Sequence, residues 1–421
     1  MTINEIKMFE LLNKIGFIRE SGSEEEKKAA ELLKKEIETI GLIGIIDSFT
    51  VKDAIVKKIN FEVLEPYNKT YNATAYLRCN NTDFKGLITD FKYVEDANEV
   101  LLKNAEGKFV LVNGYMRLPI YKKLLEAKVA GFITFSGSLN DNMTQTDLDI
   151  RRLRDQQLEL GNLPCIHIHV KDAQELILKE ANKVKVTIEQ ENIELISQNI
   201  YTEIKGTDYP NEIISFGAHY DSVPFSTGVY DNGSGSVIIM EVLKYFKENP
   251  PKRTLRFHWY GSEEVGLLGS KHYINTNKEE LKKHVFMINV DVAGAVLGKD
   301  VIKATTDQSL VDYLNYAAKN KGYAISTTQD IYSSDSTPFA DNGVPAISFC
   351  RFGELGAAFI HNRHDKIDYL SAKSLSRTTE YIIYLSEKLI NSEIFPVPRK
   401  IPENMIKKID KYFSRNLINE K

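Results

Sequence analysis

Five residues of metal-ligand type stand out in the second half of the chain, each where a strand-like run ends. They are His219, Asp231, Glu264, Asp291 and His361. Two imidazoles and three carboxylates form a mixed nitrogen and oxygen ligand set that suits a pair of divalent metal ions such as zinc. A further carboxylate, Glu263, lies beside Glu264 and is free to move protons. This combination is typical of a two-metal hydrolase.

Strand-like and helix-like stretches alternate after residue 197, and they must position these side chains. We expect strands over residues 212–218, 254–260, 285–290 and 346–349, and helices over 236–246 and 366–390. This alternation predicts an α/β fold with a mixed, mostly parallel sheet flanked by helices. Ligands of open α/β sheets collect beyond the carboxyl ends of the strands. Residues far apart in the sequence are therefore expected to meet at one edge.

The segments around the first two ligands also favour a metal site. Asp221 follows His219 by two residues, where its carboxylate can hold the imidazole and fix its tautomer. Asp231 opens the run Asp-Asn-Gly-Ser-Gly, whose small residues let the backbone come close to a metal.

The order and spacing of these motifs resemble those of the family-28 zinc metallopeptidases, co-catalytic zinc aminopeptidases similar to bacterial leucyl aminopeptidase. The matching stretches are His219-Tyr-Asp221-Ser222, residues 228–235, Glu263-Glu264 with residues 265–270, Asn289-Val-Asp291 and residues 361–365. Residues 19–23 and 334–339 resemble further motifs of that family. Ser336 departs from the pattern, because many members carry His at that position.

The resemblance implies the zinc exopeptidase fold and a role for each site residue. It makes Asp231 the carboxylate that bridges two Zn²⁺ ions, which Co²⁺ or Mn²⁺ can replace. His219 and Asp291 would complete one zinc site, and Glu264 and His361 the other. Glu263 would be the general acid and base, assisted by Asp221. A cis peptide between Asp231 and Asn232 is also implied. The expected substrates are peptides with a free N-terminus.

The segment that precedes residue 197 has a different sequence pattern. We expect residues 1–50 and 198–421 to form the catalytic domain and residues 51–197 to form an inserted β-rich domain, with a long loop over residues 136–161. The stretches 107–112, 127–133 and 163–166 resemble a protease-associated domain, which implies control of substrate access. The last ~25 residues are expected to form a charged tail.

Composition limits the remaining possibilities. The formal net charge of −4 over 421 residues predicts neither a nucleic-acid-binding nor a membrane-binding surface. The N-terminus lacks the pattern of a signal peptide, and no apolar stretch reaches the ~18 residues of a membrane span. Three scattered cysteines argue against a disulfide framework. We therefore expect a cytoplasmic protein, and the oligomeric state stays open.

Two alternatives to an aminopeptidase remain. The same metals could serve a carboxypeptidase or an amidohydrolase acting on N-acylated small substrates, since fold alone does not fix function. A non-catalytic scaffold or receptor of the same fold is the alternative from another class. His258, His167 and His169 are interpreted as structural histidines, and Arg351 as a structural arginine. Asp335 is either a turn carboxylate or a neighbour of the site.

Overall fold

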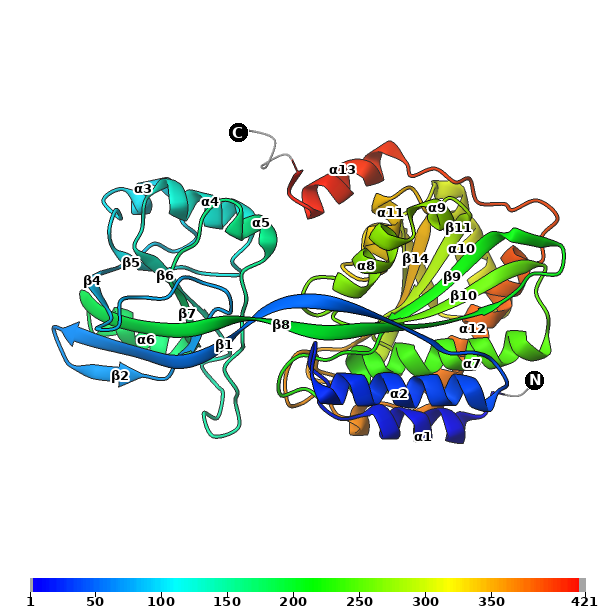
Figure 1. Ribbon diagram of the computed structural model, residues 1–421, viewed down its shortest axis with the longest axis horizontal. Helices are drawn as coiled ribbons and strands as arrows, with labels where there is room; N and C mark the ends of the chain where they lie inside the picture. The colour runs from blue at the N-terminus through cyan, green and yellow to red at the C-terminus, as the bar shows by residue number, and fades with distance from the viewer. Residues whose placement is uncertain (1–2, 416–421) are drawn as a thin grey trace. The chain divides into compact units, whose positions relative to one another are not determined.

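The computed structural model describes residues 3–415, which divide into two compact units (Figure 1). Unit 1 comprises residues 3–51 and 195–415, and unit 2 comprises residues 52–194. Residues 1–2 and 416–421, the ends of the expected catalytic segments and of the charged tail, lie outside the described residues.

Unit 1 is built on an open, mostly parallel sheet with the strand order β13-β12-β14-β11-β9-β10-β8. Neighbouring strands from β14 to β10 run parallel, as do β12 and β13, whereas β8 and β12 pair antiparallel with β10 and β14. The strands are β8 (Lys183–Ile204), β9 (Tyr209–His219), β10 (Arg253–Tyr260), β11 (His284–Val290), β12 (Gly298–Ala304), β13 (Ile325–Gln329) and β14 (Ala346–Gly353). The predicted mixed sheet is confirmed.

Helices cover both faces of this sheet, and its central strands are therefore buried on both sides. Every residue of β10 is buried. Helices α1, α2 and α7 lie on one side of the strands, and α8, α11 and α13 on the other (Figure 1). The helices are α1 (Glu5–Ile15), α2 (Glu24–Thr39), α7 (Ser234–Glu248), α8 (Leu268–Thr276), α9 (Lys278–Leu281), α10 (Gln308–Lys321), α11 (Ser336–Asp341), α12 (Ala372–Ile390) and α13 (Glu403–Tyr412).

Local capping explains where the helices begin. Helix α2 starts after Ser23, whose Oγ accepts a hydrogen bond from the Glu26 N–H at 3.0 Å. The helix expected from residue 366 begins only at Ala372, because Ser371 caps it and residues 367–369 form a separate helical turn. Helix α1 was not predicted, although four apolar residues at helical spacing fill its buried face.

Unit 2 contains the strand order β8-β4-β5-β6-β7-β3, and β1 pairs with β2 and β8. Its strands are β1 (Ile45–Glu65), β2 (Lys69–Tyr71), β3 (Thr74–Ala75), β4 (Leu87–Tyr93), β5 (Phe109–Leu111), β6 (Gly131–Ser136) and β7 (Cys165–His169). Its helices are α3 (Glu99–Leu102), α4 (Leu118–Glu126), α5 (Asp155–Leu158) and α6 (Val170–Leu178). That unit 2 is a protease-associated domain stays a prediction.

The two histidines of β7 are buried and hydrogen-bonded. His167 contacts the Thr134 hydroxyl through Nδ1 at 2.8 Å, and His169 contacts Asp141 through Nε2 at 3.0 Å. Both side chains therefore have the structural role that the sequence favours.

None of the helices within residues 3–415 combines the length and apolar character needed to cross a membrane.

Candidate metal centre

The predicted site residues gather where four adjacent parallel strands end. His219 is the last residue of β9, and Asp291 directly follows β11. Glu263 and Glu264 lie in the loop after β10, and His361 lies in the loop after β14. These strands are neighbours in the sheet, so their carboxyl ends bring the side chains to one edge.

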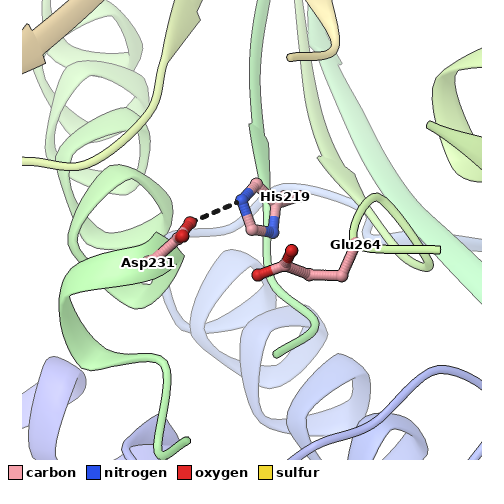
Figure 2. Close-up of side chains that lie close together, drawn as sticks. All are labelled: His219, Asp231 and Glu264. Atoms are coloured by element: carbon pink, nitrogen blue, oxygen red, sulfur yellow. Dashed lines mark hydrogen bonds and ion pairs between the residues drawn. The ribbon is translucent and has the colours of Figure 1, made fainter. Parts of the chain in front are cut away.

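Asp231 lies between the two histidines and joins them. It is part of the turn Val229–Gly233 that leads into α7, and the peptide bond to Asn232 is cis, as the family resemblance implies. Asp231 Oδ1 is 3.1 Å from His219 Nε2 (Figure 2), and Oδ2 is 3.1 Å from His361 Nε2. The two carboxylate oxygens therefore face different imidazoles.

The other carboxylates complete two neighbouring groups of ligand atoms. In the first, His219 Nε2 is 3.5 Å from Asp291 Oδ1 and 4.0 Å from Glu263 Oε2. In the second, His361 Nε2 is 3.2 Å from Glu264 Oε2. The sets His219, Asp231, Glu264 and His219, Glu263, Asp291 each place their ligand atoms within 4.8 Å of one another.

The donor atoms fit divalent cations. Glu264 Oε1 and Asp291 Oδ1 are buried, yet within residues 3–415 neither has a hydrogen-bond partner. A buried carboxylate oxygen without a donor is costly, and a cation is the partner that such an oxygen suits. The mixture of imidazole nitrogens and carboxylate oxygens is the set that zinc accepts.

Burial and the close approach of charged groups strongly shift the pKa values of these side chains. Burial raises the pKa of Glu263 well above its ordinary value, although nearby His219 opposes the rise. Burial and the charge of Asp231 raise the pKa of Glu264 to about 7. Burial alone would lower the pKa of His361, but Glu264 and Asp231 raise it to about 12. The two histidines hold the pKa of Asp231 below its usual range despite its burial. Titrating groups perturbed together in this way are typical of a functional site.

Asp221 ties the first histidine to the loop after β10. Its Oδ1 is 3.4 Å from His219 Nδ1 and also accepts the Glu263 N–H at 3.0 Å. Its Oδ2 accepts the Glu264 N–H at 3.2 Å. One carboxylate thus orients an imidazole and fixes the backbone of both glutamates.

Asp365 holds the segment that carries Asp231, a role that was not assigned from the sequence. The carboxylate is fully buried, and its Oδ1 accepts the Tyr230 N–H at 2.8 Å. Its Oδ2 accepts the Asp231 N–H at 3.1 Å and the Ser226 hydroxyl at 3.4 Å. Its place in the 361–365 motif was the only signal in the sequence.

The N-terminal segment supports both halves of the site. Arg19 is fully buried and donates to the backbone carbonyls of Tyr220, Thr227 and Gly228, so it holds the loop before Asp231. Glu26 Oε1 accepts the Ser262 N–H at 3.1 Å, one residue before Glu263. Burial and the charge of Asp221 raise the pKa of Glu26 to about 8.

The remaining side chains that the sequence singled out are buried. His258 is fully buried and stacks on Tyr260, with ring centroids 5.2 Å apart. Arg351 pairs with Asp300 at 2.6 Å. Asp335 is fully buried, and burial raises its pKa to about 7 although the charge of His219 opposes the rise. The Ser336 hydroxyl contacts the Ser348 hydroxyl at 2.7 Å.

An open, mostly parallel α/β sheet thus carries the candidate metal site at its carboxyl edge. Residues 199–386 match the sequence model described as "Peptidase family M28".

Curated relatives match the same part of the sequence and beyond it. The aminopeptidase YwaD of Bacillus subtilis (strain 168) is 30% identical over 264 residues, covering 60% of this chain and 56% of that protein. Leucine aminopeptidase 2 of Trichophyton rubrum is 34% identical over 201 residues, covering 46% of this chain and 38% of that protein. The chain thus matches little more than half the length of the first relative and less of the second.

The fold is shared with solved structures along nearly the whole chain. A zinc aminopeptidase from Bacillus subtilis superimposes with a TM-score of 0.78 at 21% identity, covering 96% of this chain and 99% of that chain. An aminopeptidase from Aneurinibacillus sp. strain AM-1 gives a TM-score of 0.75 at 20% identity, with coverages of 94% and 96%. At these identities the likeness establishes the fold.

Proposed function

We propose that the chain is a di-zinc aminopeptidase that removes single residues from the free N-terminus of peptides. The observation that carries this proposal is the placement of Asp231, whose two carboxylate oxygens lie 3.1 Å from two different histidines. His219 and Asp291 would hold one zinc, Glu264 and His361 the other, and Asp231 would bridge them. The names of the relatives point to the same activity.

Zinc at this site would act as a Lewis acid that polarises the scissile carbonyl and makes a water molecule more acidic. Glu263 would take a proton from that water on Oε2 and return it to the leaving amine. Burial raises the pKa of Glu263 above its ordinary value, which is the direction that proton transfer near neutral pH favours. Asp221 would keep Glu263 in place through the hydrogen bond to its N–H.

The exposure of the site residues suggests how a substrate enters. The side chains of His219, Asp231 and Asp291 are almost completely buried, whereas that of His361 is 51% exposed. The opening therefore lies on the side of His361. Exposed apolar side chains occur in the segments next to His361 and Asp231, namely those of Phe225, Phe352, Leu355 and Ile360. We infer that these side chains line the opening and favour an apolar N-terminal residue in the substrate.

Unit 2 is proposed to be a protease-associated domain, as its sequence resemblance implies. This proposal is tested by comparing the rates at which the full chain cleaves short and long peptides.

The activity is tested with a panel of aminoacyl-p-nitroanilides and their N-acetylated counterparts, using zinc-loaded protein. We expect release of p-nitroaniline from the free amines, fastest for leucine, and almost none from the acetylated compounds. Turnover of the acetylated substrates alone would contradict the aminopeptidase assignment and favour amidohydrolase action.

A second comparison tests the role of Glu263. Glu263→Gln should lower kcat by about 10²- to 10⁴-fold while the protein still binds zinc. Glu248→Gln serves as the matched control, because Glu248 is exposed at the end of α7. Equal rates in the two variants would remove Glu263 from the mechanism.

A further inference from the structure

Two buried cysteines lie close together in unit 2, and neither of them belongs to the metal site. Cys165 begins β7, and Cys79 follows β3 in a tight turn. Strand β3 pairs antiparallel with β7, with Ala75 opposite Ile166. The pairing continues beyond β3, where the Tyr76 N–H donates to the Cys165 carbonyl at 3.0 Å. The Cys79 N–H then donates to the Tyr76 carbonyl at 3.3 Å. This turn folds Cys79 back onto Cys165.

The contacts of the two thiols fix them in this position. Cys79 Sγ is 3.6 Å from the carbonyl oxygen of Cys165, although the two residues are 86 positions apart. Gln190 donates from Nε2 to Cys79 Sγ at 3.1 Å and to the Cys79 carbonyl at 2.8 Å. Cys165 Sγ contacts the Leu163 carbonyl at 3.0 Å. Both are free thiols in the core of unit 2, with exposures of 5% and 0%.

The surroundings make the two sulfurs chemically unequal. A hydrogen bond from the Cys165 side chain lowers the pKa of Cys79, and this effect outweighs its burial. Burial raises the pKa of Cys165 well above its ordinary value. Cys79 is also the less buried of the two sulfurs, so it is the one that a small oxidant reaches more easily.

We propose that Cys79 and Cys165 are a modification site at which a peroxide forms an intramolecular disulfide in the folded protein. Cys79 attacks one oxygen of hydrogen peroxide, the O–O bond breaks, and Cys79 becomes a sulfenic acid with release of one water. Cys165 then attacks the Cys79 sulfur, the S–OH bond breaks, and its thiol proton leaves with the hydroxyl as a second water. The two sulfurs are oxidised and the two peroxide oxygens are reduced.

The bond would tie the turn after β3 to β7 and would close a long loop of unit 2. Cross-links of long loops stabilise proteins chiefly by restricting the unfolded chain. We therefore expect the oxidised protein to melt about 5 °C or more above the reduced protein, and a dithiol reductant to reverse the shift.

The test is mass spectrometry of the full chain after treatment with hydrogen peroxide. Remaining thiols are alkylated during denaturation, and the chain is digested without reductant. We expect one cross-linked peptide pair containing Cys79 and Cys165, with Cys350 of β14 recovered in alkylated form. Recovery of all three thiols as alkylated cysteine would overturn the proposal, and so would a cross-link to Cys350.

Two variants distinguish disulfide formation from oxidation of a single cysteine. Cys350→Ser is the matched control and should form the cross-link at the wild-type rate. Cys165→Ser should form no cross-link and should instead accumulate a sulfenic acid at Cys79 that dimedone traps. Equal trapping by dimedone in wild-type protein and Cys165→Ser would mean that Cys165 does not resolve the intermediate. A variant that fails to fold does not weaken the test, because the wild-type cross-link is decisive.

Discussion

The carboxylate of Asp365 offers a sharp test of how the fold prepares the metal site. It accepts the backbone N–H groups of Tyr230 and Asp231 at 2.8 and 3.1 Å, one on each oxygen. The substitution Asp365→Asn keeps the size and shape of the side chain. However, it leaves only one accepting oxygen and turns an NH₂ group towards one of the two N–H donors. One backbone donor beside the proposed bridging carboxylate would then lose its partner.

The expected loss of binding free energy follows from that single lost hydrogen bond. A hydrogen bond to a charged group contributes about 1.5–3 kcal/mol. Because the lost bond fixes the conformation in which Asp231 faces both histidines, we expect the cost to appear mainly in metal binding. Each ~1.4 kcal/mol corresponds to tenfold in an equilibrium constant, so zinc affinity should fall by about 10- to 100-fold.

Competition with a chromophoric chelator measures this change. The titration should be made at pH 8, above the pKa of about 7 to which burial raises Asp365, so that the wild-type carboxylate is ionised. Asp368→Asn is the matched control, since Asp368 is an exposed aspartate in the same loop region. A folded Asp365→Asn protein whose zinc affinity stays within about twofold of the control would refute the reasoning.

Three further predictions follow from the same structure. The pKa of Glu26 is raised from 4.5 to about 8, so the folded state holds this proton more tightly than the unfolded chain. Its contribution to stability is present below pH 4.5 and is lost as the pH rises through about 8. In urea unfolding, wild-type stability should therefore fall relative to Glu26→Gln over that range, and parallel curves would contradict the assignment. Gly235→Ala would place a Cβ 2.4 Å from the Val290 carbonyl oxygen and 2.5 Å from Asn232 Oδ1. Such overpacking should destabilise the protein by about 1–3 kcal/mol in urea, and an unchanged midpoint would speak against this close contact. Removal of zinc should lower the melting temperature, because a ligand that binds only the folded state stabilises it by about 2.7 kcal/mol at 100 times its Kd. Asp231→Asn should reduce the sensitivity of the melting temperature to a chelator, and undiminished sensitivity would show that the zinc binds elsewhere.

The sheet and the meeting of the site residues could be foreseen because both follow from local patterns. His219 and Asp291 stand at the ends of buried apolar strands, and parallel strands bring such ends to one edge. The start of α2 was also predictable, since Ser23 and the acidic residues after it are a standard N-cap sequence.

The residues that support the site could not be assigned in the same way. Asp365 and Glu26 act by accepting backbone N–H groups of segments far away in the sequence, and no periodic pattern marks such contacts. Arg19 is charged yet fully buried, and the hydrogen bonds described for its guanidinium group all go to backbone carbonyls. A composition rule places an arginine at the surface, and only the tertiary structure overrides it.

The proposed bridging role of Asp231 is tested most directly by anomalous diffraction at the zinc edge from crystals grown with zinc. We predict two anomalous peaks, one on each side of the Asp231 carboxylate. The first should contact His219 and Asp291, and the second should contact Glu264 and His361. A single peak, or two peaks of which neither touches Asp231, would contradict the account.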